Sequence, residues 1–534
     1  MNEGFREFLE RLRRERELVD IKQPVDIRHI ATLVDQSEPA LFFHNIIGYR
    51  LPVVSGLYRT QRRITLAMGC GQFREIEDKL RQGLDHPVAP RYLETAPHKE
   101  VIQTGDDVDL LTLPIPMSSI YDGGPMITAG VVMSRDSEYG FNSGVYRFLV
   151  KEKNLTGIDI VTPNNMRLFA QRALEGGRAL PISISIGTHP CEIMGAGFRA
   201  PVGVDEMGIA GGIRGAPAEL AQCETIDLPC VAGAEIVLEA EILPTGWTWP
   251  EGRFGEFTRL MGGLHWNPLV RIKAITRRRD AIYYSLHMPW ENTWLGASTR
   301  YTAIRAALKN AGVQVRDLNV TTGGCAMWHA VISVKKQAGE GKNALLAALS
   351  VMDVKHAVVV DEDIDVFDAM DVEWAIATRV QGDRDVFVIP GARAKPLDPS
   401  LPIVPFGTVP TGAKVGIDAT IGEGIPRERF ERISYAYADR AKITDYVAGK
   451  ADAVPATLDA PAGEISKLAK EIHALIESTP RYYSDIAEHF ADFDFRSITR
   501  ALSQLHAEEK LWQDPRGRMC IRGSQHAAKP PTRA

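Results

Sequence analysis

The chain has 534 residues, enough for roughly three to four domains of about 150 residues each, so a disulfide miniprotein or a bare peptide module is excluded. Apolar residues make up 45% of the sequence and charged residues 24%, a composition typical of a folded soluble protein rather than a disordered one. The 62 basic and 68 acidic residues give a net charge of −6, which argues against a protein that binds nucleic acid or anionic lipid through a broad basic surface.

Cysteine usage and the N-terminus indicate the compartment. The 6 cysteines are scattered without a C-x-x-C pair, which argues against a zinc ribbon and against the disulfide framework of a secreted protein. The first residues predict a charged amphipathic helix rather than a signal peptide, and no apolar run of about 18 residues occurs. We therefore expect a cytoplasmic protein with no membrane partner.

The spacing of apolar residues divides the first 301 residues into two parts. Apolar residues between Phe5 and Leu12 recur at helical spacing and lead into short extended runs, which predicts an N-terminal α/β cap over residues 1–120. From 121 to 301 the period becomes two, and glycines are frequent. This part is expected to hold an antiparallel sheet or barrel, with strands at 182–186, 234–242 and 281–286.

Helices and strands alternate after residue 301. This βαβ order predicts an α/β domain with a parallel or mixed sheet over residues 302–455. The helices are expected at 302–311, 343–349 and 370–379, and the strands at 330–334, 357–360 and 386–389.

A Pro- and Ala-rich stretch at 454–461 leads into a C-terminal extension, residues 456–534. Helical patterns at 465–476, 483–490 and 497–505, followed by short strands near Leu511 and Met519, resemble the order of a winged helix. Residues 481–522 contain seven Lys or Arg and seven Asp or Glu, so no basic footprint for nucleic acid is present. An assembly or lid role is favoured over nucleic-acid binding.

Common catalytic signatures are absent from the sequence. It contains no G-x-x-x-x-G-K-[ST], H-E-x-x-H or G-x-S-x-G, and no G-x-G-x-x-G on a strand–helix turn, which argues against standard NTPases, zincins, α/β-hydrolases and Rossmann enzymes. The acidic run 361–365 ends a predicted strand, where Mg²⁺ sites occur, but an acidic turn is the more frequent use of such residues.

An acidic loop is the first candidate site. Glu251 and Glu256 bracket the apolar Phe254 in a Gly-rich turn. Enclosure by aromatic rings would raise the pKa of a carboxyl group toward neutrality, as a general acid requires. A solvated acidic loop is the alternative interpretation.

Two further segments combine polar residues with small ones. In 141–147, Ser143 and Gly144 allow close approach of the backbone to a ligand, Asn142 offers an oxygen ligand, and Arg147 can hold a carboxylate bidentately. In 411–418, Lys414 sits among small residues, where it could meet a phosphate or remain a solvated lysine.

Taken in order, these motifs resemble the UbiD-type decarboxylases, which include 4-hydroxy-3-polyprenylbenzoate and ferulic acid decarboxylases and use prenylated FMN. The resemblance covers most of residues 1–450. It rests on 142–147, 204–215, 234–239, 251–256, 363–366 with 374–379, and 412–418.

The resemblance implies a UbiD-like α/β fold: a split β-barrel that binds prenylated FMN, over residues 121–301, and a C-terminal α/β oligomerisation domain. It makes Arg147, Glu251 and Glu256 the catalytic residues. A divalent cation (Mn²⁺, with Mg²⁺ or Fe²⁺ as alternatives) would bridge the cofactor phosphate to Asn142, Asn165 and Glu206, with K⁺ nearby. The implied cofactor-binding residues are Asn142, Ser143, Gly144, Val145, Tyr146, Arg147, Asn164, Asn165, Glu206 and Lys414.

The sequence departs from the family pattern at two positions. Asn165 stands where ferulic-type relatives place a metal-ligating histidine, and an amide oxygen still suits a hard cation. Arg253 stands where relatives carry proline. If it faces the pocket it could bind a second anionic group of the substrate, although an outward, solvated side chain is favoured.

The implied reaction is reversible, non-oxidative decarboxylation of an aromatic, heteroaromatic or α,β-unsaturated carboxylic acid, or of its CoA thioester, through a covalent prenylated-FMN adduct. Arg147 would orient the carboxylate, Glu256 would deliver a proton, and Glu251 would hold Arg147. A flavin prenyltransferase would supply the cofactor, and a homodimer or homohexamer is expected. The alternatives are a two-carboxylate hydrolase such as a glycosidase and a non-catalytic nucleic-acid-binding assembly protein.

Overall fold

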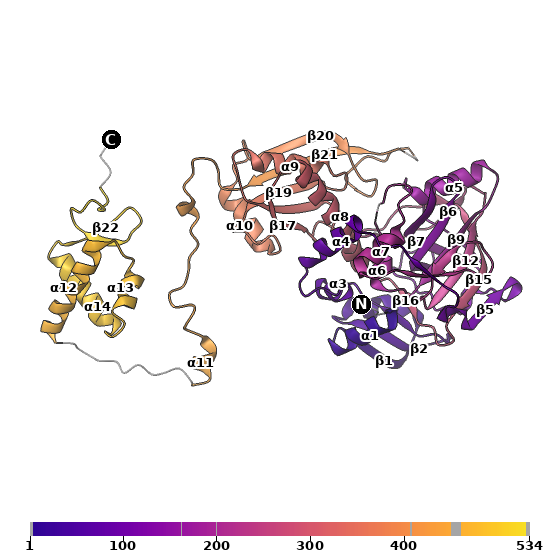
Figure 1. The fold of residues 1–534 in the computed structure, drawn as a ribbon, viewed down its shortest axis with the longest axis horizontal. Coiled ribbons are helices and arrows are strands. Elements are labelled where there is room, and N and C mark those ends of the chain that lie inside the picture. Colours follow the sequence, from indigo (N-terminus) through magenta and orange to yellow (C-terminus); the bar gives the residue numbers. More distant parts are fainter. Residues whose placement is uncertain (1–3, 162, 199, 406–407, 450–460, 530–534) are drawn as a thin grey trace. The chain divides into compact units, whose positions relative to one another are not determined.

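A computed structural model describes residues 4–161, 163–198, 200–405, 408–449 and 461–529 (Figure 1). The chain forms two compact units, which divide between Ile425 and Pro426. The linker predicted at 454–461 lies almost wholly outside the described residues. Among the described residues, no helix combines the length and apolar character needed to cross a bilayer.

The predicted N-terminal helix is α1 (Phe5–Arg14), whose apolar side chains at Phe5, Phe8, Leu9 and Leu12 are all buried. The sheet beside it has the order β1-β2-β3-β16. Its strands are β1 (Leu18–Val25), β2 (Ala40–Ile46), β3 (Val53–Ser55) and β16 (Tyr283–Ser285), and the accompanying helices are α2 (Ile30–Gln36), α3 (Gln61–Ala67) and α4 (Glu75–Asp85).

One strand of this first sheet comes from much later in the chain. The run 281–286 was expected to continue the middle sheet, but β16 pairs in parallel with β3. The expectation fails because an apolar run of this length fixes a strand but not its partner. Figure 1 shows β16 close to the N-terminal elements.

The central sheet, which carries the candidate site, has the strand order β12-β9-β6-β7-β8-β15-β5. Its strands are β5 (Val101–Thr104), β6 (Met126–Asp136), β7 (Gly140–Glu152), β8 (Leu155–Gly157), β9 (Leu180–Ile186), β12 (Ile236–Ile242) and β15 (Leu269–Arg277). All of their pairings are antiparallel. Because β12 also pairs with β15, the series of pairings from β12 through β9, β6, β7, β8 and β15 leads back to β12. The expected antiparallel sheet is present; its closure as a split β-barrel stays a prediction.

Smaller elements surround this sheet. β10 (Glu219–Gln222) pairs with β11 (Pro229–Val231) and with β4 (Arg91–Leu93), and β13 (Trp249–Glu251) pairs with β14 (His265–Asn267). The helices are α5 (Asn165–Glu175), α6 (Pro190–Ala196) and α7 (Glu206–Arg214).

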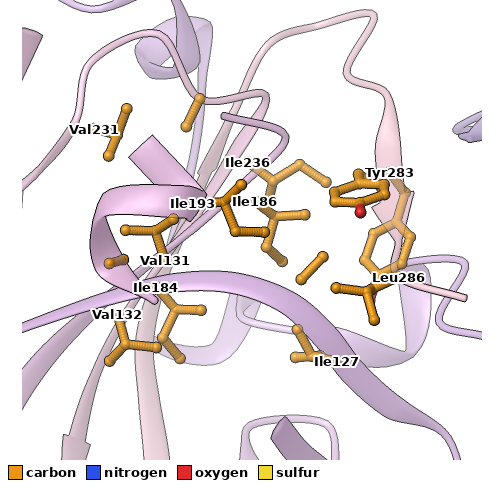
Figure 2. Close-up of a cluster of buried hydrophobic side chains, with 14 of the residues drawn as sticks. Ile127, Val131, Val132, Ile184, Ile186, Ile193, Val231, Ile236, Tyr283 and Leu286 are labelled. Atoms are coloured by element: carbon orange, nitrogen blue, oxygen red, sulfur yellow. The ribbon is translucent and has the colours of Figure 1, made fainter. Parts of the chain in front are cut away.

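An apolar core joins the two sheets (Figure 2). Strands β6, β9 and β12, helix α6 and strand β16 all contribute side chains, among them Ile127, Ile184, Ile193, Ile236 and Tyr283. Burial of each such side chain stabilises the fold by about 1.5–3 kcal/mol. The core therefore fixes β6, and with it the neighbouring β7.

The third part is the expected α/β domain. Helix α8 (Trp290–Asn310) starts well before the predicted 302 and leads into a mixed sheet of order β17-β18-β19-β21-β20. Its strands are β17 (Val315–Val320), β18 (His329–Val334), β19 (His356–Asp361), β20 (Val386–Arg393) and β21 (Thr411–Ala419), with α9 (Glu340–Ser350) and α10 (Ala369–Arg379). The acidic run 361–365 begins at the last residue of β19 and takes part in ion pairs, because the buried Arg379 binds both Asp361 and Asp363.

The second unit contains the predicted winged-helix order. Helices α12 (Ala462–Ser478), α13 (Tyr483–His489) and α14 (Phe495–Ala507) precede the hairpin of β22 (Leu511–Gln513) and β23 (Met519–Ile521). A short helix, α11 (Ile443–Val447), comes earlier in this unit. Its small core lies between α12 and α14, at Leu468, Ile472, Ile498 and Leu502.

A buried carboxylate ties the start of α8 to the first sheet. Glu291 accepts hydrogen bonds from the backbone N–H groups of Gly56 (3.0 Å) and Tyr58 (2.8 Å). It also accepts from the Tyr284 hydroxyl at 2.9 Å and from the His287 backbone. One side chain therefore satisfies donors that would otherwise be buried without partners.

Glu291→Ala is expected to destabilise the protein strongly, because several buried donors lose their acceptor together. The midpoint of thermal unfolding should fall by at least about 5 °C in differential scanning fluorimetry. Glu362→Ala, at an exposed position, is the matched control and should leave the midpoint unchanged. Equal midpoints for the two variants would contradict this account of Glu291.

Candidate active site

Strand β7 contributes to two polar clusters. At its start Asn142 and Ser143 are buried, and the Ser143 N–H donates to Glu206 Oε2 at 2.8 Å. Glu206 is the first residue of α7 and is only 1% exposed. Burial raises the pKa of Glu206 to about 7. Within the described residues, no Lys or Arg side chain pairs with this carboxylate.

The cluster around Glu206 contains polar atoms that lack partners. Asn142 Nδ2 and Ser143 Oγ are buried without a hydrogen bond among the described residues. Burial, with the charge of Glu206 nearby, raises the pKa of Tyr146. A Cβ on Gly144 would come within 2.4 Å of the Tyr146 ring, so no larger residue fits there. These features suit a bound polar group and a cation.

The two asparagines at the start of α5 make different contacts. Asn164 is the N-cap and its side chain accepts from the Arg167 N–H at 2.8 Å. Asn165 donates through Nδ2 to the Ala200 carbonyl at 3.2 Å, which leaves its amide oxygen as an acceptor. The next residue, Met166, contacts Ser134, which pairs with Asn142 across β6 and β7. No hydrogen bond joins Asn165 to the Asn142 cluster in the described chain, and its part in a cation site stays a prediction.

The second cluster surrounds Arg147, farther along β7. Its Nη1 donates to Glu256 Oε1 at 2.8 Å, and its Nη2 lies 2.5 Å from Asp159 Oδ2. His265 Nδ1 is 3.3 Å from Arg147 Nη2 and 3.2 Å from Asp159 Oδ1. The guanidinium carbon stands 4.9 Å from the centre of the Phe254 ring. The Arg147 side chain is 12% exposed, so its charge is met almost entirely by protein groups.

Glu251 lies beside this cluster and is 1% exposed. Neither of its carboxylate oxygens has a hydrogen-bond partner among the described residues. It pairs in register with His265 across β13 and β14. A Cβ on Gly157 would come within 2.2 Å of Glu251 Oε2, so the glycine makes room for this carboxylate.

The carboxylates differ in their tendency to hold a proton. Burial raises the pKa of Glu256 and of Glu251, and the charge of Arg147 opposes this in both. Burial acts in the same direction on Asp159, but the hydrogen bond from His265 and the charge of Arg147 prevail and lower the pKa of Asp159. Asp159 is thus the fixed anion of the cluster, and Glu256 is the group suited to carry a proton.

The structure brings Arg147 and Glu256 into contact and places Glu251 nearby, but Glu251 does not hold Arg147 as expected, because Asp159 occupies that place. The sequence indicated neither Asp159 nor His265. Asp159 follows β8 between the buried Ile158 and Ile160. An isolated Asp in an apolar run is the one signal that could have marked it. His265 had no such signal, since it stands in a Gly-rich segment whose pairing with β13 is visible only in the fold.

Two positively charged side chains that the sequence singled out, Lys414 and Arg253, take no part in either polar cluster of the described chain. Lys414, on β21, donates to the carbonyls of Leu349 and Val351 at 2.6 and 2.7 Å. It lines a cavity of about 250 Å³ in the α/β domain, and no described contact joins it to Glu206 or the start of β7. Arg253 is exposed, and its guanidinium carbon lies 5.7 Å from the centre of the Tyr121 ring. The phosphate role of Lys414 stays a prediction.

Replacement of Asp159 by Asn is expected to lower the pKa of His265. The hydrogen bond to Asp159 raises the pKa of His265 above its ordinary value, so the protonated imidazole is favoured in the folded state. The stabilisation is complete below the ordinary pKa of histidine and is lost as the pH rises through the higher folded value. The measurement is an NMR titration of labelled histidine, assigned with His265→Gln. An unchanged His265 pKa in Asp159→Asn would contradict the pairing.

The fold and the arginine–carboxylate cluster define a UbiD-class decarboxylase. Family models of the 3-octaprenyl-4-hydroxybenzoate carboxy-lyase match the chain in three parts: the N-terminal domain at residues 9–80, the Rift-related domain at 91–289 and the C-terminal domain at 293–419. The chain belongs to the UbiD family.

Curated relatives extend the match over almost their whole length. The chain is 34% identical to the anhydromevalonate phosphate decarboxylase of Methanothermobacter thermautotrophicus, over 80% of this chain and 99% of that protein. It is also 34% identical to the enzyme of the same name from Methanosarcina mazei, over 80% and 98%.

Solved structures give the same result. The UbiD-class enzyme HmfF from Pelotomaculum thermopropionicum, in complex with FMN, has a TM-score of 0.78 and 38% identity, covering 83% of this chain and all of that one. The 3,4-dihydroxybenzoic acid decarboxylase of Enterobacter cloacae has a TM-score of 0.75 and 27% identity, covering 84% and 99%.

These comparisons confirm the family resemblance, the α/β class and the carboxy-lyase activity predicted from the sequence. They do not favour a glycosidase-like hydrolase or a non-catalytic nucleic-acid-binding protein. The FMN and prenylated FMN named in the HmfF structures belong to those proteins. The divalent cation, K⁺, the oligomeric state and the cytoplasmic location stay predictions.

Proposed function

We propose that this chain uses prenylated FMN to decarboxylate, reversibly and without net oxidation, an α,β-unsaturated carboxylic acid that carries a phosphate. The cluster in which Glu256 and Asp159 hold the buried Arg147 supports the reaction. The relatives named anhydromevalonate phosphate decarboxylase support the substrate class, because that name gives a phosphorylated, non-aromatic acid.

An aromatic acid is the second candidate. Decarboxylases of 3,4-dihydroxybenzoic acid and vanillic acid share the fold, with identities of 27% and 28%. These are lower than the 34% of the relatives named for the phosphorylated acid, so we rank the aromatic substrate second.

Arg147 binds and orients the substrate carboxylate. A guanidinium already held on two sides by Glu256 and Asp159 keeps its plane fixed, so the carboxylate meets donors that need no reorganisation. Loss of CO₂ from an unsaturated carbon leaves an electron pair that no side chain can delocalise. When bound, prenylated FMN supplies the electrophilic centre that accepts this pair.

Glu256 transfers the proton that replaces CO₂. Burial favours its protonated form, and its contact with Arg147 Nη1 places it beside the carboxylate site. Glu251 adds a second buried carboxyl group whose charge acts on Arg147. Asp159 holds the other edge of the guanidinium and keeps it charged, and His265 contacts Asp159.

The cluster around Glu206 would hold the cofactor. The segment 142–146 would approach its phosphate end through backbone groups and Ser143. Glu206 and the amide oxygens of Asn142 and Asn165 form a hard-oxygen donor set that suits Mn²⁺, Mg²⁺ or Fe²⁺. A flavin prenyltransferase would supply the cofactor. The assembly would be a homodimer or homohexamer, and an evolved dimeric form of HmfF is among the similar structures.

Glu256→Gln should abolish turnover while the flavin stays bound. The protein is co-expressed with a flavin prenyltransferase, and CO₂ release is measured with a phosphorylated α,β-unsaturated acid and with 3,4-dihydroxybenzoate. We expect turnover of the phosphorylated acid by the unchanged protein and a loss of at least about 100-fold in Glu256→Gln.

Glu241→Gln, which alters a partly exposed carboxylate on β12, is the control and should keep full activity. Full activity in Glu256→Gln would refute the proton-transfer role. Turnover of the aromatic acid alone would refute the proposed substrate class and leave the role of Glu256 standing.

Glu206→Gln should weaken retention of the divalent metal at least about tenfold, and the flavin absorbance of the purified protein should fall with it. Metal content is measured by mass spectrometry and flavin by visible absorbance. Glu192→Gln is the matched control, because burial also raises the pKa of Glu192 to about 7 but its carboxylate pairs with Arg214. Normal metal and flavin content in Glu206→Gln would rule out the assigned site.

A further inference from the structure

Two cysteines meet in the hairpin of β10 and β11, outside the decarboxylation site. Cys230 lies in β11 opposite Ala221, and Cys223 directly follows β10, where its N–H donates to the Leu228 carbonyl at 3.0 Å. Both side chains are buried, and the two thiol groups are close enough that each shifts the pKa of the other. The hairpin therefore brings two sulfur atoms together that six residues separate in the sequence.

A histidine completes this cluster. His98 Nε2 lies 3.5 Å from Cys230 Sγ, and its Nδ1 lies 2.8 Å from Thr276 Oγ1. The His98 side chain is fully buried, so its orientation is set by these two contacts. Thr276 belongs to β15, and the cluster thus connects the hairpin to the central sheet.

The two thiols differ in acidity. The interaction with the Cys223 thiol lowers the pKa of Cys230 against the effect of burial, and the contact with His98 acts in the same direction. The same interaction, together with burial, raises the pKa of Cys223. Burial is the main cause that raises the pKa of Cys191 to about 12. Of the two thiols, Cys230 is thus the one that ionises more readily, and Cys223 is the one placed to attack it after oxidation.

The hairpin is anchored on both sides of its turn. The buried Glu239 accepts from the backbone N–H groups of Glu224 and Thr225 at 2.7 and 2.6 Å. Arg135, on β6, donates to the Asp227 carbonyl at 3.1 Å. These contacts hold the turn that connects the two cysteines in place in the folded protein.

We propose that Cys223 and Cys230 form a peroxide-oxidisable dithiol that closes to an intramolecular disulfide. The Cys230 thiolate attacks one oxygen of hydrogen peroxide; an S–O bond forms, the O–O bond breaks, and hydroxide leaves and is protonated to water. Cys223 then attacks the sulfur of the resulting sulfenic acid; an S–S bond forms and a second water leaves. Two thiols lose two electrons in total, and one peroxide is reduced to two waters.

The test uses the full-length protein, treated with hydrogen peroxide, unfolded, alkylated and digested with trypsin. Both cysteines lie in one tryptic peptide, residues 215–253, because no Lys or Arg interrupts it. We expect this peptide to become about 2 Da lighter, to resist alkylation at both cysteines, and to recover both changes on reduction. Two alkylatable cysteines after treatment, or a sulfinic acid on Cys230 beside a free Cys223, would overturn the proposal.

Two variants refine the test. Cys70→Ser removes a thiol outside the cluster and should leave the oxidation of peptide 215–253 unchanged, whereas Cys223→Ser should leave no disulfide within that peptide. His98→Gln should slow disulfide formation at least about threefold, since the thiolate loses a hydrogen-bond partner. A disulfide whose rate of formation is the same in His98→Gln would overturn the part assigned to the histidine.

Discussion

The site depends on the burial of one positive charge. Arg147 is almost fully enclosed, and a guanidinium cannot lose its proton under ordinary conditions, so the surrounding groups must supply its counter-charge. Asp159 does so as a fixed anion. Two more ionised carboxylates in the same space would leave a surplus of negative charge. Burial shifts Glu251 and Glu256 toward their protonated forms, and the hydrogen bond to Asp159 raises the pKa of His265, which favours the protonated imidazole. The balance of charge around Arg147 therefore favours a protonated carboxyl group in the cluster, and that group can act as the proton donor.

This balance requires a rigid support, and strand β7 provides it. The strand pairs with β6 along most of its length, and β6 contributes to the apolar core that joins the central sheet to the first one. Because β7 bears Asn142 and Ser143 near one end and Arg147 farther along, one strand sets the spacing between the proposed cofactor cluster and the carboxylate site. A change in the register of β7 would separate both sets of side chains from their partners.

The sequence indicated the residues whose role follows from ordered motifs. Arg147, Glu251 and Glu256 could be predicted as a group because their spacing matches a family pattern, and α1 could be predicted because its apolar spacing is helical. Asp159 and His265 could not, since their contact with Arg147 depends on how β8, β14 and β7 come together. Strand β21 was not expected either, because glycines and a lysine interrupt its apolar pattern; its pairings with β19 and β20 hold it in place.

The return of the chain to its first sheet has a consequence for synthesis on the ribosome. Strand β3 is made early, but its parallel partner β16 and the Glu291 carboxylate, which satisfies donors at Gly56 and Tyr58, emerge only after the whole central sheet. Until then β3 presents an open edge, the kind of surface that pairs with other chains. The N-terminal part is therefore the first to leave the ribosome, but its sheet is completed only after the central sheet has been made, and the edge of β3 stays open during that interval.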